Sequence, residues 1–166
     1  MKEKIAQLRN KILLSIFIIT ICFLTDRISK IYVINYFIQN NLSDLYINPY
    51  LNLILLWNKG IAFGLLESES FFYNFLSILI FMIIVFIIYL IFKSEKKFEI
   101  VCFSMISGGA IGNFIDRLYY NAVPDFIDIN YKGFHWFTFN IADIWITLGI
   151  VTLLSFEIIS DIKKND

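Results

Sequence analysis

Long apolar segments constrain this chain most, because each is long enough to cross a lipid bilayer as a helix. A membrane-spanning helix needs about 20 mostly apolar residues, and residues 71–92 meet this requirement almost without interruption. Residues 98–118 and 141–160 meet it with polar residues near their ends, and residues 12–37 contain a shorter run that resumes after a charged stretch. The sequence therefore predicts an all-α membrane protein with four transmembrane helices.

The first of these segments has a second interpretation, a cleaved secretory signal peptide, because a basic start precedes its apolar run. The run ends in residues 20–25, which lack the small side chains that cleavage requires. We therefore expect this segment to remain in the protein as its first helix.

The composition favours the same class of protein. Of the 166 residues, 58% are hydrophobic and 17% are charged, whereas soluble domains are about half apolar and about a quarter charged. The length is that of one domain, so we expect residues 1–166 to form a single integral-membrane domain. The formal net charge of zero excludes the polycationic surface that a nucleic-acid-binding protein needs.

Few residues are suited to hold a metal ion or a cofactor. Cys22 and Cys102 lie separately within apolar runs, which is typical of small buried hydrophobic side chains. His135 is the only histidine and lies in an aromatic stretch, where we expect it to pack at the membrane interface. A single histidine does not form a zinc site. We therefore expect no metal site and no cofactor.

The basic residues are distributed unevenly, and cytoplasmic flanks of membrane helices are the ones enriched in Lys and Arg. Nine of the fourteen lie before the first predicted helix, between the second and third, or at the C-terminus: Lys2, Lys4, Arg9, Lys11, Lys93, Lys96, Lys97, Lys163 and Lys164. This distribution predicts that both termini are cytoplasmic. The loops at about residues 40–66 and 123–139 then lie on the outer side.

These two outer loops contain patterns that are typical of β-strands. Residues 50–58 and 126–131 each alternate between two classes of side chain with a period of two. Lys132 and Gly133 then indicate a turn into residues 134–139, which makes a hairpin. We therefore expect a small β-sheet on the outer membrane face, with its aromatic side chains at the lipid headgroups.

The third predicted helix combines small residues with polar ones at its outer end. Ser104, Gly108, Gly112 and Asp116 recur every four residues and share one face, and small residues at this spacing let another helix approach closely. Close packing alone explains the glycines. It does not explain the neighbouring polar residues, which are Asn113, Asp116 and Arg117.

The acidic residues each have a structural alternative when taken alone. Asn140 precedes Asp143 by three residues, which is the spacing of a helix capping box. Asp125 could be an ordinary loop residue, and we interpret Asp128 as one. Asp26 and Lys30 are spaced as a helical ion pair, and we favour a structural role for them.

Taken together, the outer acids favour catalysis over structure. Two carboxylates a few ångströms apart do not both ionise at low cost, so one keeps a proton while the other acts as a base. Such a pair, here Asp125 and Asp143, can activate water toward a carbonyl and protonate the leaving amine. Asparagine amides and a guanidinium can orient the peptide and the developing oxyanion. This is the chemistry of an aspartic peptidase.

Five blocks of the sequence resemble, in order, the motifs of the lipoprotein signal peptidase (signal peptidase II) family. They are Asp26 with Lys30 and residues 57–64, 108–117, 123–126 and 139–143. The resemblance covers nearly the whole chain, with Ile61 standing where many relatives have alanine. It implies an intramembrane aspartic endopeptidase of the bacterial inner membrane. Its substrates would be diacylglyceryl-modified prolipoproteins, cleaved just before the lipidated cysteine.

Carried over by motif, the resemblance makes Asp125 and Asp143 the catalytic pair. It assigns substrate-binding or supporting roles to Asn58, Asn113, Asp116, Arg117, Asn140, Asp26 and Lys30, with Asp116 organising Arg117. It further implies inhibition by the cyclic peptide globomycin, contact with membrane lipid, and an active site toward the periplasmic, outer leaflet. The loop after Trp57 would be a mobile clamp over the substrate.

Two other functions fit part of the pattern. A proton-coupled transporter also places acids in membrane helices, but its binding groups usually lie near the midplane and often in repeated halves, and no repeat is visible here. A magnesium-dependent lipid phosphotransferase would use carboxylates as hard ligands. We expect its acids to be clustered at helical spacing, whereas here they are spread over three segments.

Overall fold

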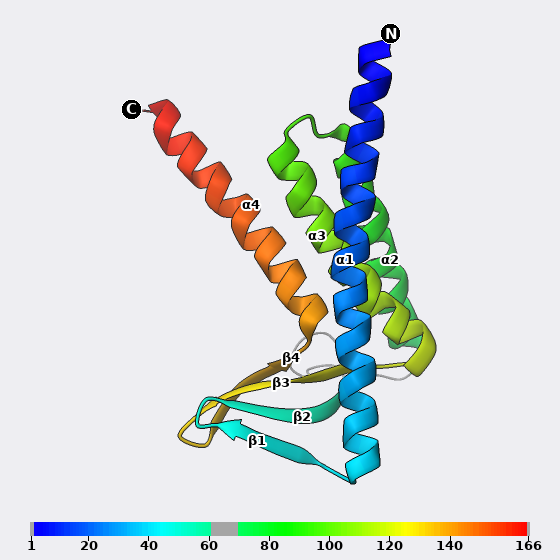
Figure 1. Ribbon diagram of the computed structural model, residues 1–166, viewed down its shortest axis with the longest axis vertical. Coiled ribbons are helices and arrows are strands. Elements are labelled where there is room, and N and C mark those ends of the chain that lie inside the picture. Colours follow the sequence, from blue (N-terminus) through cyan, green and yellow to red (C-terminus); the bar gives the residue numbers. More distant parts are fainter. Residues whose placement is uncertain (1, 61–69, 166) are drawn as a thin grey trace.

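The computed structural model describes residues 2–60 and 70–165 and contains four α-helices and four β-strands (Figure 1). The elements, in chain order, are α1 (Lys2–Asn40), β1 (Asp44–Asn48), β2 (Leu51–Asn58), α2 (Ser70–Lys93), α3 (Lys97–Tyr120), β3 (Val123–Tyr131), β4 (Phe134–Phe139) and α4 (Ile141–Asn165). Each helix contains a stretch long and apolar enough to cross a membrane. The prediction of four such helices and a small sheet is confirmed.

The start of α1, the end of α4 and the α2–α3 connection lie at one end of the molecule, and the sheet lies at the other (Figure 1). α1 is longer than predicted, with 39 residues that begin at Lys2 rather than near residue 12. Its added residues are mostly Lys, Glu, Gln, Leu and Arg, which are good helix formers and extend the helix beyond its apolar part. α4 also continues beyond its apolar part and ends at Asn165.

Glycines allow α3 to pack closely against both α1 and α4. A Cβ on Gly108 would lie 2.7 Å from the Cys22 Cβ of α1, and one on Gly109 would lie 2.5 Å from the Ala142 carbonyl oxygen of α4. Gly112 leaves room for Asp26, whose Oδ2 would be 2.6 Å from an added Cβ. Because these contacts are on two faces of one helix, α3 holds α1 and α4 at fixed positions around the polar residues near the sheet.

The four strands form an antiparallel sheet in the order β1-β2-β3-β4. Its anchor is a small core in which Phe126 of β3 packs with Val33 and Phe37 from the C-terminal part of α1. β1 was not predicted, because it is a short edge strand with mostly exposed residues and a weak apolar alternation. β3 follows α3 and β4 ends directly before Asn140, so the β3–β4 hairpin connects two helices of the bundle.

Candidate active site

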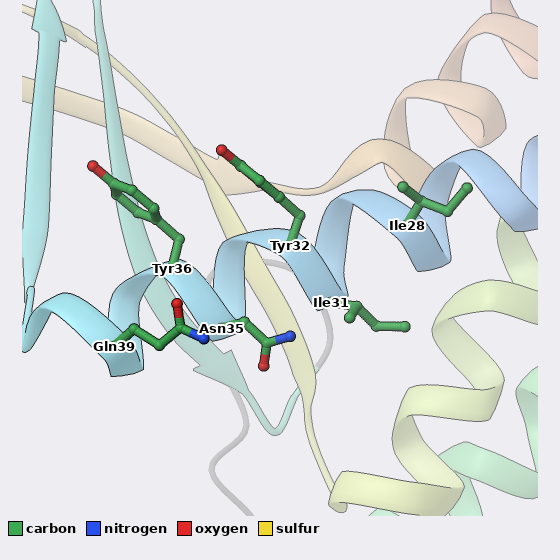
Figure 2. Close-up of a pocket in the computed structure, with 6 residues that line it drawn as sticks. All are labelled: Ile28, Ile31, Tyr32, Asn35, Tyr36 and Gln39. Carbon is green, nitrogen blue, oxygen red and sulfur yellow. The ribbon is translucent and has the colours of Figure 1, made fainter.

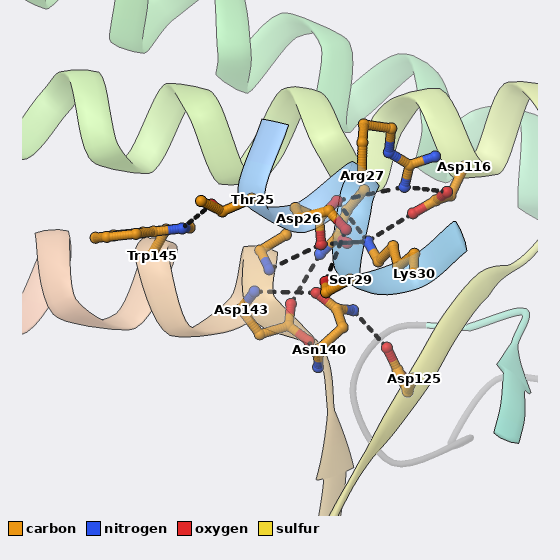
Figure 3. A network of polar contacts seen from close by, with 12 residues as sticks. Thr25, Asp26, Arg27, Ser29, Lys30, Asp116, Asp125, Asn140, Asp143 and Trp145 are labelled. Carbon is orange, nitrogen blue, oxygen red and sulfur yellow. Dashed lines mark hydrogen bonds and ion pairs between the residues drawn. The ribbon is translucent and has the colours of Figure 1, made fainter. Parts of the chain in front are cut away.

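Asn140, the residue directly before α4, connects the two aspartates that the sequence singled out (Figure 3). Its side-chain Nδ2 donates a hydrogen bond of 2.5 Å to Asp125 Oδ1. Its backbone N–H donates to Asp143 Oδ2 at 3.2 Å, and its Oδ1 accepts from the backbone N–H of Asp143 at 3.1 Å. The structure therefore brings Asp125 and Asp143 to one site that shares this asparagine.

The reciprocal contacts of Asn140 and Asp143 form the capping box expected from their spacing. Asp143 has a further role in the site, because Asn113 of α3 donates its Nδ2 to Asp143 Oδ1 at 2.8 Å. Both carboxylate oxygens of Asp143 thus accept hydrogen bonds, one from the residue before α4 and one from α3. These bonds orient the carboxylate, so capping and site geometry depend on the same residue.

Asp125 lies in β3 with only 2% of its surface exposed, and both of its oxygens also accept hydrogen bonds. Asn58, the last residue of β2, donates its Nδ2 to Asp125 Oδ2 at 2.9 Å. The Asn58 Oδ1 accepts the backbone N–H of Gly60 at 3.0 Å, which fixes the orientation of the amide. Three strands or strand ends of the sheet therefore contribute to the position of this carboxylate.

The pKa of Asp125 is raised to about 6, chiefly because burial removes water from the charged form. Hydrogen bonds from Asn58 and Asn140 favour the charged form and oppose this effect, whereas the nearby negative charge of Asp143 adds to it. An aspartate with this pKa exchanges its proton near neutral pH. That property suits a carboxyl that must both hold and release a proton during a reaction.

Lys30 is the centre of a buried charged network on the α1 side of the site (Figure 3). Its Nζ lies 2.8 Å from Asp26 Oδ1, 2.6 Å from Asp116 Oδ2 and 2.8 Å from Asn113 Oδ1. Arg27 binds Asp116 as well and lies 3.3 Å from Asp26. Two cationic side chains therefore balance two buried carboxylates. Because Asn113 also binds Asp143, the network is directly connected to the candidate catalytic residues.

Asp26 has a second contact that places it at the start of α4. Its Oδ1 accepts the backbone N–H of Ala142 at 3.0 Å. The first N–H groups of a helix have no partners within the helix, and here Asp26 accepts that of Ala142 and Asn140 accepts that of Asp143. The Asp26–Lys30 pair is thus more than a local ion pair, since it joins α1 to α3 and α4.

Arg117 lies apart from this network, which corrects one expectation. Asp116 was expected to organise Arg117, but its carboxylate contacts Arg27 and Lys30 instead. The reason is helical geometry, because successive residues of an α-helix point about 100° apart. Arg117 donates its Nη2 to the Gly60 carbonyl at 2.7 Å and lies over the Tyr73 ring, with its Cζ 5.6 Å from the ring centre.

Arg27 and Tyr73 were not predicted from the sequence, and the prediction for Asp128 was wrong. Charge within an apolar run was a usable signal for Arg27, but nothing in the sequence indicated its pairing with Asp116, 89 residues away. Asp128 was interpreted as an ordinary loop residue, and this was wrong. It lies within β3, is 1% exposed and pairs with His135, whose side chain was expected only to pack.

Two predicted features, the mobile clamp after Trp57 and the end of the motif block at residues 57–64, fall largely on residues 61–69, which lie outside the described residues. Within residues 2–60 and 70–165, the structure has no group of three or more His, Cys, Asp or Glu side chains that could hold a metal ion.

Comparison with known proteins identifies the family to which this arrangement belongs. The sequence model of signal peptidase (SPase) II matches residues 18–159, which is most of the chain. The chain belongs to the signal peptidase II family. The lipoprotein signal peptidase of Pelagibacter ubique (strain HTCC1062) is 46% identical over 154 residues, which cover 92% of each chain. That of Anaplasma phagocytophilum (strain HZ) is 36% identical and covers 90% of this chain and 94% of its own.

Solved structures support the same conclusion. The fold is similar to that of a bacterial membrane enzyme determined by the in meso method, with a TM-score of 0.69 and 28% sequence identity over 95% of this chain and 92% of that one. A second such enzyme gives a TM-score of 0.63 at 30% identity and covers 87% of this chain and 90% of its own. Membership in the signal peptidase II family favours a peptidase over the transporter and the lipid phosphotransferase.

Proposed function

We propose that Asp125 and Asp143 are the catalytic pair of a peptidase that removes the signal peptides of prolipoproteins. The activity follows from the family, which consists of lipoprotein signal peptidases of the aspartic type. The assignment of the pair rests on one observation, the shared contacts of Asn140 with Asp125 and with Asp143. A residue that binds both carboxylates holds them in a fixed relation, which a two-carboxylate mechanism requires.

In this mechanism the pair carries one proton, because two neighbouring carboxylates do not both ionise at low cost. The ionised member removes a proton from a water molecule, which then attacks the carbonyl of the scissile peptide bond. The protonated member stabilises the developing oxyanion and then protonates the leaving amine. A pKa near 6 for Asp125 supports this sharing, because its proton is neither held tightly nor lost completely near neutral pH.

The remaining site residues would position the pair and the substrate. Asn113 and Asn140 orient Asp143, while Asn58 orients Asp125. Lys30, Asp26 and Asp116 support Asn113 and the start of α4. The Arg117 guanidinium is buried, and its Nε and Nη1 have no hydrogen-bond partner among the described residues. These two nitrogen atoms carry three N–H groups, which are suited to bind carbonyl oxygens of the substrate.

The substrate would be a diacylglyceryl-modified prolipoprotein that reaches the site from the outer leaflet of the bacterial inner membrane. Two observations support this location. The basic residues gather near the termini and the α2–α3 connection, and the sheet and aspartates lie at the opposite end of the helices (Figure 1). If the basic end is cytoplasmic, the aspartates open to the outer leaflet. The lipid-anchored cysteine of the substrate would be held at the level of the aspartates in that leaflet.

Membrane lipid would contact the protein along the outer half of α1, where a groove of about 380 Å³ lies (Figure 2). The groove is lined by Ile28, Ile31, Tyr32, Asn35, Tyr36 and Gln39. The Tyr32 and Tyr36 rings are stacked, with centres 6.2 Å apart, and both side chains are exposed. Tyrosines are typical of the membrane–water interface, so this groove supports placing this part of α1 at that interface.

The proposal is tested with purified protein in detergent and two forms of one prolipoprotein, with and without the diacylglyceryl group. We expect cleavage before the modified cysteine, detected as a mobility shift and located by mass spectrometry. Globomycin should inhibit this cleavage, and EDTA should leave it unchanged. Equal cleavage of the unmodified form would contradict the proposed substrate, and loss of activity with EDTA would contradict the proposed mechanism.

A further inference from the structure

The β3–β4 hairpin contains a buried carboxylate paired with an exposed histidine, and the proposed mechanism uses neither residue. Asp128 of β3 is 1% exposed, and its Oδ2 lies 2.7 Å from His135 Nδ1 of β4. An ionised carboxylate only accepts hydrogen bonds, so Nδ1 carries the proton in this contact. The other oxygen, Oδ1, has no hydrogen-bond partner among the described residues. His135 is therefore the residue on which the buried carboxylate depends.

A β-bulge brings His135 to the face of the sheet that carries Asp128. The register pairs Ile129 with Phe137 and then Asn130 with His135, so Trp136 is an extra residue in β4. Directly opposed residues of an antiparallel pair point to the same face. Without the extra residue, His135 would oppose Tyr131 and point away from Asp128. The bulge and the Asp128–His135 contact thus belong together, as expected where a bulge re-aims a side chain.

Apolar side chains do not by themselves specify how β3 and β4 align. Adjacent residues of β3, Phe126 and Ile127, are both apolar, and β4 is almost entirely aromatic. Phe134, Trp136 and Phe137 are 64%, 61% and 44% exposed, so aromatic side chains remain on the surface whatever the register. Register is specified weakly when a strand lacks one buried apolar face and one polar face. The two-residue turn at Lys132 and Gly133, both with positive φ, sets the alignment at the tip of the hairpin. Beyond the bulge at Trp136, another interaction must hold the alignment toward the site.

The alignment of this hairpin determines the geometry of the site. Asp125 lies three residues before Asp128 in β3, and Asn140 directly follows the end of β4. A slip of one residue would move one strand by about 3.3 Å relative to the other. That displacement would break the 2.5 Å hydrogen bond between Asn140 and Asp125.

We propose that Asp128 and His135 form a positioning pair that locks the register of the β3–β4 hairpin and thereby keeps Asp125 aligned with Asn140 and Asp143. In a slipped register Asp128 would be buried without the N–H donor of His135, which is unfavourable. The pair therefore acts by excluding wrong alignments more than by stabilising the right one. The consequence for catalysis rests on the proposed catalytic pair, whereas the effect on register does not.

Disulfide formation between the strands tests the register directly. Ile129→Cys with Phe137→Cys reports the observed alignment, because these residues are direct partners. Ile129→Cys with Thr138→Cys reports a one-residue slip. We expect the first pair to crosslink and the second not to, in the wild-type background. With Asp128→Asn or His135→Gln, the first yield should fall at least twofold and the second should rise. Unchanged yields in both variants would overturn the proposal.

Enzyme kinetics separate positioning from general stability. His135→Gln replaces a largely exposed side chain, so the protein should fold, and we expect kcat to fall about tenfold or more with KM changed less than twofold. His135→Arg keeps an N–H donor for Asp128 and should restore most of kcat. Lys132→Gln, at the hairpin turn, is the matched control and should behave as wild type. A loss of kcat with unchanged crosslinking would overturn the register lock but leave the proposed function intact.

Discussion

At the scale of single residues, Asn140 shows how one side chain can serve both folding and chemistry. As the residue before α4, it satisfies the backbone N–H of Asp143, which any helix start requires. The same amide uses its Nδ2 to hold Asp125. Replacing Asn140 by aspartate would keep the cap but lose the donor to Asp125. The identity of this residue is therefore set by the site and not by helix capping alone.

We predict that Asp125→Asn and Asp143→Asn each reduce cleavage by at least about a hundredfold, which is the scale of general acid–base catalysis. An amide has nearly the shape of a carboxyl but does not exchange a proton in this pH range. Cleavage of a diacylglyceryl prolipoprotein by each purified variant measures the effect. Size-exclusion profiles that match wild type would show that folding is intact. Near-normal turnover by either variant would refute its catalytic role.

The raised pKa of Asp125 predicts a pH-dependent stability. The folded state holds this proton up to about pH 6, whereas the unfolded state releases it near 3.8. Between these values the folded state binds more protons, so stability falls as pH rises. A shift of about 2 units corresponds to at most about 3 kcal/mol.

Thermal unfolding in detergent from pH 4 to pH 7 tests this point. The Asp125→Asn variant should lack the decline that Asp125 causes in wild type, so the difference between their midpoints should change across this range. A constant difference at all pH values would show that the pKa of Asp125 is not raised. The altered hydrogen bonds with Asn58 and Asn140 shift the unfolding midpoint by a constant amount at every pH. They therefore do not affect this comparison, which uses only the change of the midpoint difference with pH.

At the scale of elements, the sequence predicted what depends on local pattern and missed what depends on pairing at a distance. The helices were predictable because an apolar length of about 20 residues has few alternatives. β1 was not, because an exposed edge strand takes its conformation from β2. Asp125 and Asp143 were found because acids are rare among apolar residues. The Arg27–Asp116 pair joins two helices, and single-residue spacing carries no information about such a contact.

The close packing of α3 leads to a prediction at the element scale. Gly109→Ala would place a methyl group 2.5 Å from the Ala142 carbonyl oxygen, so α4 must move away from α3. We expect destabilisation of about 1–3 kcal/mol and reduced cleavage, because Asp143 moves with α4. Thermal unfolding and cleavage assays measure both effects. Leu118→Ala, at a 64% exposed position of the same helix, is the control. If Gly109→Ala equals this control in both assays, α3 does not fix α4.

At the scale of the whole molecule, the proposed reaction requires a defined orientation in the membrane. We predict that both termini and the α2–α3 connection are cytoplasmic and that the sheet is on the outer side. Ser43→Cys and Lys132→Cys should react with a thiol reagent that does not cross the membrane, in cells with a permeable outer barrier. Glu95→Cys should react only after lysis. The native cysteines are each 1% exposed, so background labelling should be low. The reverse labelling pattern would refute the orientation and the access of lipidated substrate.

The charged network also has a consequence for how the protein is made. The outer part of α1 contributes two cations, Arg27 and Lys30, but only one of the carboxylates that balance them, Asp26. The other, Asp116, is on α3, which the ribosome synthesises later. Newly inserted α1 therefore carries an excess positive charge that is costly within lipid. Pairing with Asp116 removes this excess only after α3 has been synthesised and packs against α1.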